Sequence, residues 1–201
     1  MKIIIQSLKV YVIFSVVLGL GYPLAITFVA QLSMPYKANG SLIKKDGIVI
    51  GSNLIGQGFT KHGYFHSRPS AVNYDATNSG AANLGPSSKK LMDATAMNIK
   101  NVKQDNNLAQ GALIPADMVL SSASGLDPHI SLENALVQAE RVSNARDIPV
   151  IILKGMISKN TEPDFVGIWG RPGVNVLKLN MALDGFEKNK KEILNQSRGI
   201  I

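Results

Sequence analysis

Three side chains that hydrolases use for nucleophilic catalysis lie within six residues of one another, at Ser124, Asp127 and His129. In such enzymes a serine attacks, a histidine takes its proton and an aspartate orients the histidine. Triad members usually converge from separated parts of a chain, and no G-x-S-x-G turn surrounds Ser124. Asp127 and Pro128 also predict a simple turn before a helix. A membrane-anchored cell-envelope hydrolase that uses these three residues is therefore kept as the alternative hypothesis.

A second candidate site is the glycine-rich segment Gly51–Gly58, which has the glycine spacing of a phosphate-binding loop. Such a loop needs a lysine for the phosphates and a hydroxyl for magnesium, and here a glutamine and a glycine stand in those places. We therefore expect no independent site for nucleotide hydrolysis. His62 and His66 have the spacing of helical metal ligands, but they flank Gly63 in a segment without helical periodicity. Cysteine is absent as well, so we expect this chain to bind no metal.

These polar segments follow a long apolar stretch, residues 10–32, in which none of the twenty-three side chains is charged. As a helix it would be about 34 Å long, enough to cross a hydrocarbon core of about 30 Å. A cleavable signal peptide is the competing interpretation, but its apolar region runs only about 7 to 15 residues. We therefore predict a short leader at residues 1–9 and a retained transmembrane helix at residues 10–32.

Gly19, Gly21 and Pro23 cluster near the middle of this predicted span. Glycine lets a second backbone approach closely, and proline frees a carbonyl that a neighbouring helix can satisfy. One interpretation is a kinked helix packed against partner membrane helices. The other is that glycine and proline are simply more frequent in membrane helices than elsewhere. The sequence leaves both interpretations open.

The rest of the chain predicts one mixed α+β domain outside the membrane, residues 33–185. Ser131 is expected to cap a helix whose apolar stripe faces the core. Gln138 and Arg141 are expected to lie off that stripe. The elements predicted in order are a hairpin at 41–50 with its turn at Asp46-Gly47, helices beginning near 87, 131 and 150, and a strand at 174–180.

A long polar region, residues 51–88, separates the predicted hairpin from the first of these helices. It has no helical period, but its aromatic side chains favour an ordered structure over a disordered one. Within it, we expect Arg68 to bond backbone carbonyls of its own loop.

The charge distribution narrows the choice of partners. The chain has a formal net charge of +7 and a pI of about 9.6, but its basic residues are scattered and no stripe interleaves them with aromatics. This pattern favours contact with anionic membrane lipid. We do not expect nucleic acid as a partner. Lysines on both sides of the span leave its orientation undecided by charge. A very short leader before a large domain favours export of that domain.

Several sequence blocks together indicate a family that no single motif identifies. They are Gly51-Ser-x-Leu-Ile-Gly-Gln57, Tyr64-Phe-His-Ser-Arg-Pro-Ser70, Ser79-Gly-Ala-Ala-Asn-Leu-Gly-Pro-Ser-Ser88, Ser122-Ala-Ser-Gly-Leu-Asp-Pro-His-Ile-Ser131, Gln138-x-x-Arg-Val142 and Val174-Asn-Val-Leu-x-Leu-Asn180. With the N-terminal span in front of them, the chain resembles the C subunit of the Kdp potassium-transporting ATPase. The resemblance covers essentially the whole chain.

This resemblance implies an accessory, non-hydrolysing subunit of a high-affinity, ATP-driven potassium uptake complex in the cell membrane. Its partners would be a potassium-conducting subunit, a P-type ATPase subunit and a small single-span subunit. It also implies a catalytic chaperone that stabilises the assembly and raises the ATP affinity of the ATPase subunit, with a nucleotide contact to be sought at Gln138, Ser124 and Gly125.

The same resemblance places the N-terminus in the cytoplasm and the C-terminal domain outside it. Because ATP is cytoplasmic, a direct contact from an external domain has no simple route, and coupling would have to pass through the membrane helices. Residues 186–201 run past the usual end of the family. They carry several lysines and are expected to form a charged tail that is flexible or faces lipid.

Overall fold

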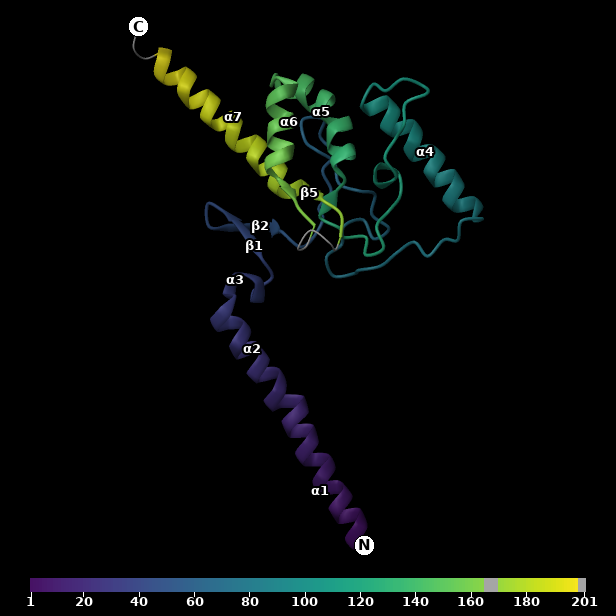
Figure 1. The fold of residues 1–201 in the computed structure, drawn as a ribbon, viewed down its shortest axis with the longest axis vertical. Coiled ribbons are helices and arrows are strands. Elements are labelled where there is room, and N and C mark those ends of the chain that lie inside the picture. The colour runs from purple at the N-terminus through teal and green to yellow at the C-terminus, as the bar shows by residue number, and fades with distance from the viewer. Residues whose placement is uncertain (165–169, 199–201) are drawn as a thin grey trace. The chain divides into compact units, whose positions relative to one another are not determined.

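The computed structural model describes residues 1–164 and 170–198, with side chains as far as Glu192 (Figure 1). It divides into two compact units, Met1–Ser52 and Asn53–Ile201. The predicted boundaries between leader, span, domain and tail stay predictions.

The first unit begins with an apolar helix, Lys2–Ser33, that is long enough to cross a membrane and contains an 18-residue stretch with a mean hydropathy of 2.2. It consists of α1 (Lys2–Val16), a π-helical turn η1 (Val17–Gly21) and α2 (Tyr22–Ser33). None of its residues is buried. An apolar helix without a protein partner is stable in a membrane because its backbone bonds internally and lipid solvates its side chains.

After α3 (Pro35–Ala38), the first unit ends in the predicted hairpin. Strand β1 (Leu42–Lys45) pairs antiparallel with β2 (Ile48–Ser52), with an irregularity between Ile43 and Lys44. The turn residues Asp46 and Gly47 have φ angles of 51° and 80°. Two successive positive φ values are what a tight hairpin turn requires, so this prediction is confirmed.

The second unit mixes helices with a small sheet, which confirms the α+β class. Its sheet is antiparallel throughout, with strand order β3-β5-β4. Its elements are α4 (Lys89–Asp105), the 3₁₀ turn η2 (Ala116–Met118), β3 (His129–Ile130), α5 (Leu132–Arg146), α6 (Val150–Lys159), β4 (Thr161–Glu162), β5 (Gly173–Asn175) and α7 (Val176–Arg198).

The core of this unit lies where α5, α6 and α7 pack together (Figure 1). Fully buried side chains from all three helices meet there, together with those of β3, β5 and the loop residue Phe65. Ser131 caps α5 as predicted, since its hydroxyl accepts a 3.1 Å hydrogen bond from the Asn134 N–H. The helices predicted to begin near 87, 131 and 150 are thus confirmed.

One prediction about the C-terminal part is wrong. The expected strand at 174–180 ends at Asn175, because the Asn175 side chain accepts a 3.1 Å bond from the Lys178 N–H and so caps a helix start. Residues 186–198 of the predicted charged tail continue α7, and contact of this part with lipid stays a prediction. Phe186 packs against the core, and Glu187 lies 2.8 Å from Arg146. These contacts stabilise the helix beyond residue 185.

Candidate functional site

The segment from His62 to His66 starts in a turn, where the Tyr64 N–H donates to the Lys61 carbonyl, and it pairs with no strand among the described residues. Instead, side chains of α5 and α7 donate to five successive backbone carbonyls. The pairs are Arg141 to His62 and Tyr64, Arg146 to Gly63, Asn180 to Phe65, and Gln138 to His66. A buried carbonyl without a donor is costly, so this set of side chains determines where the segment lies.

Two carboxamides hold adjacent residues of this segment from different helices. Asn180 of α7 accepts from the Phe65 N–H at 2.9 Å and donates to the Phe65 carbonyl at 2.9 Å. Gln138 of α5 does the same for His66, at 2.7 and 3.0 Å. Each carboxamide thus takes the place of a neighbouring strand in a sheet.

The hydrogen bonds of Gln138 are all used inside the domain. Its oxygen also accepts from Arg141 at 2.6 Å, and its nitrogen also donates to Asn134 at 2.7 Å. A glutamine side chain has two donors and two acceptor sites, and all four are engaged. Gln138 is only 2% exposed. A ligand could bond to it only after one of these internal bonds had broken.

Arg141 carries a positive charge into the same cluster and is 7% exposed. It donates to Asn106 and Gln138 in addition to the two carbonyls. Burial lowers the pKa of Arg141 to about 10, and nearby Asp105 opposes this shift. Since no carboxylate bonds it directly within the described residues, neutral oxygens solvate the buried guanidinium.

The predicted apolar stripe of α5 is wrong in part. Gln138 and Arg141 were expected to lie off the buried face, but both are buried. Leu132 and Leu136 were expected to lie on that face, but they are 37% and 39% exposed. The helix faces its loop with amides and a guanidinium because the loop presents backbone groups rather than apolar side chains. The signal in the sequence was the spacing of Asn134, Gln138 and Arg141, which places three polar residues on one helical face.

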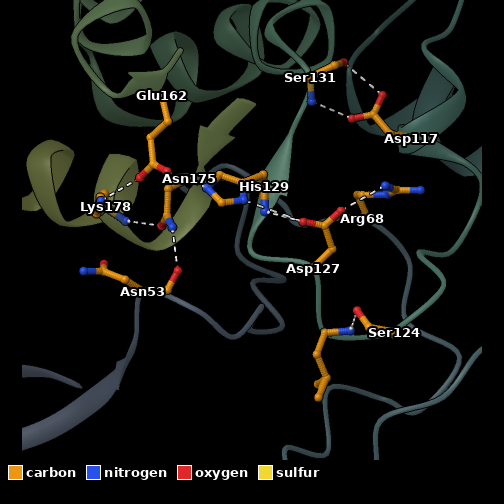
Figure 2. A network of polar contacts seen from close by, with 11 residues as sticks. Asn53, Arg68, Asp117, Ser124, Asp127, His129, Ser131, Glu162, Asn175 and Lys178 are labelled. Carbon is orange, nitrogen blue, oxygen red and sulfur yellow. Dashed lines mark hydrogen bonds and ion pairs between the residues drawn. The ribbon is translucent and has the colours of Figure 1, made fainter. Parts of the chain in front are cut away.

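The structure does not assemble Ser124, Asp127 and His129 into a triad (Figure 2). The Ser124 hydroxyl accepts from the Leu126 N–H at 3.1 Å, and the Nε2 atom of His129 faces Glu162 at 3.1 Å. In a triad that nitrogen faces the serine. Asp127 accepts from the His129 backbone N–H at 3.0 Å and is 3.8 Å from the ring Nδ1. The geometry therefore gives no support to the hydrolase hypothesis.

Asp127 and Asp117 have another role, at the edge of the sheet. β3 pairs with β5, and the Val176 N–H donates to the Pro128 carbonyl, so the N–H groups of His129 and Ser131 point to the other side. Asp127 accepts from the first at 3.0 Å and Asp117 from the second at 2.7 Å. The two carboxylates thus occupy the donors to which another strand would pair.

A series of polar contacts between ionisable side chains extends outward from this edge (Figure 2). Lys178 contacts Glu162 at 2.6 Å, Glu162 contacts His129, and Asp127 contacts Arg68 at 3.0 Å. Hydrogen bonding to Lys178 lowers the pKa of Glu162, with a smaller contribution from His129. Arg68 was expected to bond carbonyls of its own loop, but its partners are Asp127 and the Ser121 carbonyl of a distant segment.

The turn at Ser124 and Gly125 packs against the loop of residues 70–80. The Ser124 carbonyl accepts from the Gly80 N–H at 2.9 Å, and the Gly125 carbonyl accepts from Ser70 at 2.6 Å. Gly125 has a φ of +69°, and a Cβ there would lie 2.7 Å from Val72. The turn therefore serves loop packing, and its contacts are separate from those of Gln138.

A groove of about 750 Å³ opens beside the charged edge of the sheet. Arg68, Asp127 and His129 line it together with apolar side chains, whereas Ser124, Gly125 and Gln138 do not. Within residues 1–164 and 170–198, no group of three or more histidine, aspartate or glutamate side chains is arranged to hold a metal ion.

Comparison with known proteins decides the family. The model of the family described as KdpC, K+-transporting ATPase c chain, matches residues 4–185. The chain belongs to this family. Proteins named potassium-transporting ATPase KdpC subunit align along nearly all of it. That of Caldanaerobacter subterraneus subsp. tengcongensis is 46% identical over 187 residues, 92% of this chain and 97% of its own. That of Koribacter versatilis is 46% identical over 188 residues, which are 92% of this chain and 96% of its own. That of Mycobacterium tuberculosis H37Rv is 45% identical over 183 residues, which are 90% of this chain and 97% of its own.

Family membership confirms the resemblance seen in the sequence. It makes the chain a subunit of a K+-transporting ATPase. The matched region ends at residue 185, so the last part of α7 lies beyond the family model. The nucleotide contact at Gln138, Ser124 and Gly125 stays a prediction.

Replacing Gln138 by leucine should lower the free energy of unfolding by roughly 3–5 kcal/mol, because both backbone groups of His66 lose their partner in a buried place. Urea unfolding of the chain in detergent, followed by circular dichroism, measures this loss. Glu140→Leu, an exposed position on the same helix, is the control and should change stability by less than about 1 kcal/mol. Equal midpoints for the two variants would contradict the role assigned to Gln138.

Stability should fall as the pH drops below about 6.5, and His66 should contribute to that fall. Burial, followed by the charge of Arg141, lowers the pKa of His66. The unfolded chain then binds more protons than the folded one, so acid favours unfolding. Unfolding midpoints of the wild type and of His66→Gln between pH 7.5 and 5.5 test this. The variant should lose less stability than the wild type over this range, and equal losses in the two proteins would contradict the contribution of His66.

Proposed function

We propose that this chain is an accessory, non-hydrolysing subunit of a high-affinity potassium uptake complex, where it stabilises the assembly and supports the ATPase subunit. The observation that carries the proposal is the family match across residues 4–185. The engaged polar groups of the domain support an assembling role over a catalytic one. Its partners would be the potassium-conducting, ATPase and small single-span subunits, with membrane lipid around the span.

In this proposal Lys2–Ser33 crosses the cell membrane with the N-terminus in the cytoplasm and the domain outside. The helix has the length and hydropathy for one crossing. Gly19, Gly21 and Pro23 would be its packing positions toward partner helices, with Gly19 and Pro23 on one side and Gly21 on nearly the opposite side, because all three lie within the exposed apolar helix. A single anchor in lipid alone would need no such cluster.

The subunit would act as a catalytic chaperone that raises the ATP affinity of its partner indirectly. Two arguments support an indirect effect over a contact at Gln138, Ser124 and Gly125. Gln138 has no free hydrogen-bonding group, and the Ser124-Gly125 turn is bonded to the loop at Ser70 and Gly80. An external domain would also lie across the membrane from ATP. The coupling would then be a difference in binding between two states of the ATPase subunit.

Deleting the chain tests the proposed function. The remaining subunits should show a lower potassium-stimulated ATPase activity and a weaker apparent affinity for ATP, and supplying the chain again should restore both. The apparent affinity for ATP is measured by titration at saturating potassium. Unchanged potassium stimulation and unchanged ATP affinity in the depleted complex would contradict the proposal.

The orientation has its own test, because the chain contains no cysteine. A single Ser87→Cys change, at an exposed turn before α4, should react in intact cells with a membrane-impermeant thiol reagent. Labelling that appears only after the membrane is broken would place the domain in the cytoplasm. A Lys2→Cys variant serves as the control and should react only after lysis.

A further inference from the structure

The π-helical turn in the membrane helix leaves backbone carbonyls without donors. At the end of η1, the Tyr22 N–H bonds to the Val17 carbonyl, one residue further back than in an α-helix. The next residue, Pro23, has no N–H to give. Regular α-helical bonding resumes in α2, whose N-cap is Gly21. The Gly21 carbonyl therefore accepts from the N–H of the residue four positions later, as in any α-helix.

The number of available N–H groups shows how many carbonyls lack a donor. The carbonyls of Val17 and Gly21 have partners. Those of Leu18, Gly19 and Leu20 lie between them. Only the Leu24 N–H remains to serve them, since Pro23 contributes none. Two of the three carbonyls therefore have no donor within the helix.

The described residues offer these carbonyls no other donor. No side chain among the residues that the structure describes donates to Leu18, Gly19 or Leu20. A Cβ at Gly19 would have no atom within 4 Å, so the backbone is open on that side. These residues lie near the middle of the apolar helix, where neither water nor lipid headgroups can reach the carbonyls.

We infer that the carbonyls at Leu18–Leu20 are an acceptor site for an uncharged donor side chain, a hydroxyl or a carboxamide, on a membrane helix of a partner subunit. This inference rests on the proposed function, in which the span lies among other membrane helices. Such side chains bond across helices in membranes, whereas a charged donor at this depth is costly. Gly19 carries no side chain to keep the partner helix at a distance.

Pro23→Ala in the assembled complex is the decisive variant. Alanine restores the missing N–H and lets the helix satisfy one more carbonyl itself, so the partner's donor gains less. The chain should then dissociate from the other subunits more readily, by roughly three- to twentyfold in the bound-to-free ratio after mild detergent extraction. Pro35→Ala, at the start of α3, is the matched control and should leave this ratio unchanged.

Gly19→Leu separates hydrogen bonding from simple packing. It leaves the number of backbone donors unchanged but blocks the approach to the carbonyls, so it should also weaken retention. If Gly19→Leu weakens retention and Pro23→Ala does not, the contact is packing alone and the acceptor site is overturned. Retention unchanged in both variants overturns it as well, as does a change confined to association between two copies of this chain.

Each variant must remain inserted in the membrane, which alkaline extraction verifies before retention is measured. Potassium-stimulated ATPase activity, compared with and without the wild-type chain, keeps the two proposals distinguishable. Unweakened retention with activity that depends on the chain defeats the acceptor site only. Activity that does not depend on the chain defeats the proposed function.

Discussion

The second unit depends on one constraint, which is that the backbone of residues 62–66 is buried in part but has no strand beside it. Its five carbonyls take donors from Gln138, Arg141, Arg146 and Asn180. Because these donors come from α5 and α7, the segment joins the two helices. Phe65 then enters the core between them with no exposed surface. Hydrogen bonds and apolar burial thus stabilise the same arrangement, and losing either would release the other.

The sequence was sufficient where structure is local. The span follows from its hydropathy, the hairpin from Asp46 and Gly47, and the start of α5 from Ser131, since each of these signals acts within a few residues. The hydrogen bonds that α5 and α7 make to residues 62–66, here called the loop clamp, were not predictable in this way. Gln138 lies 72 residues from His66 and Asn180 lies 115 residues from Phe65. A polar residue on a helix carries no sign of the distant backbone group that it will meet.

The candidate triad failed for the opposite reason, because closeness in sequence suggested a convergence that the fold does not make. Ser124 lies in a turn, and His129 has already entered β3. Asp127 lies at the edge of the sheet, where it and Asp117 accept the N–H groups that another strand would use. Both carboxylates therefore serve to occupy the hydrogen-bond donors of a short sheet edge that would otherwise be open.

The bonded polar groups around Gln138 contrast with the carbonyls at Leu18–Leu20. This contrast bears on how the subunit could influence an ATPase. A ligand or partner shifts an equilibrium only by its difference in binding between two states, so coupling needs groups whose bonds can change. In the loop clamp, the donors and acceptors of Gln138 are satisfied within the domain, and exchanging them would expose buried polar groups. In the apolar N-terminal helix, two of the carbonyls at Leu18–Leu20 lack internal donors, and under the proposed function each state of a neighbouring helix would satisfy them to a different degree. A state-dependent contribution to the complex is therefore better sought in the span than in the rigid interior of the domain.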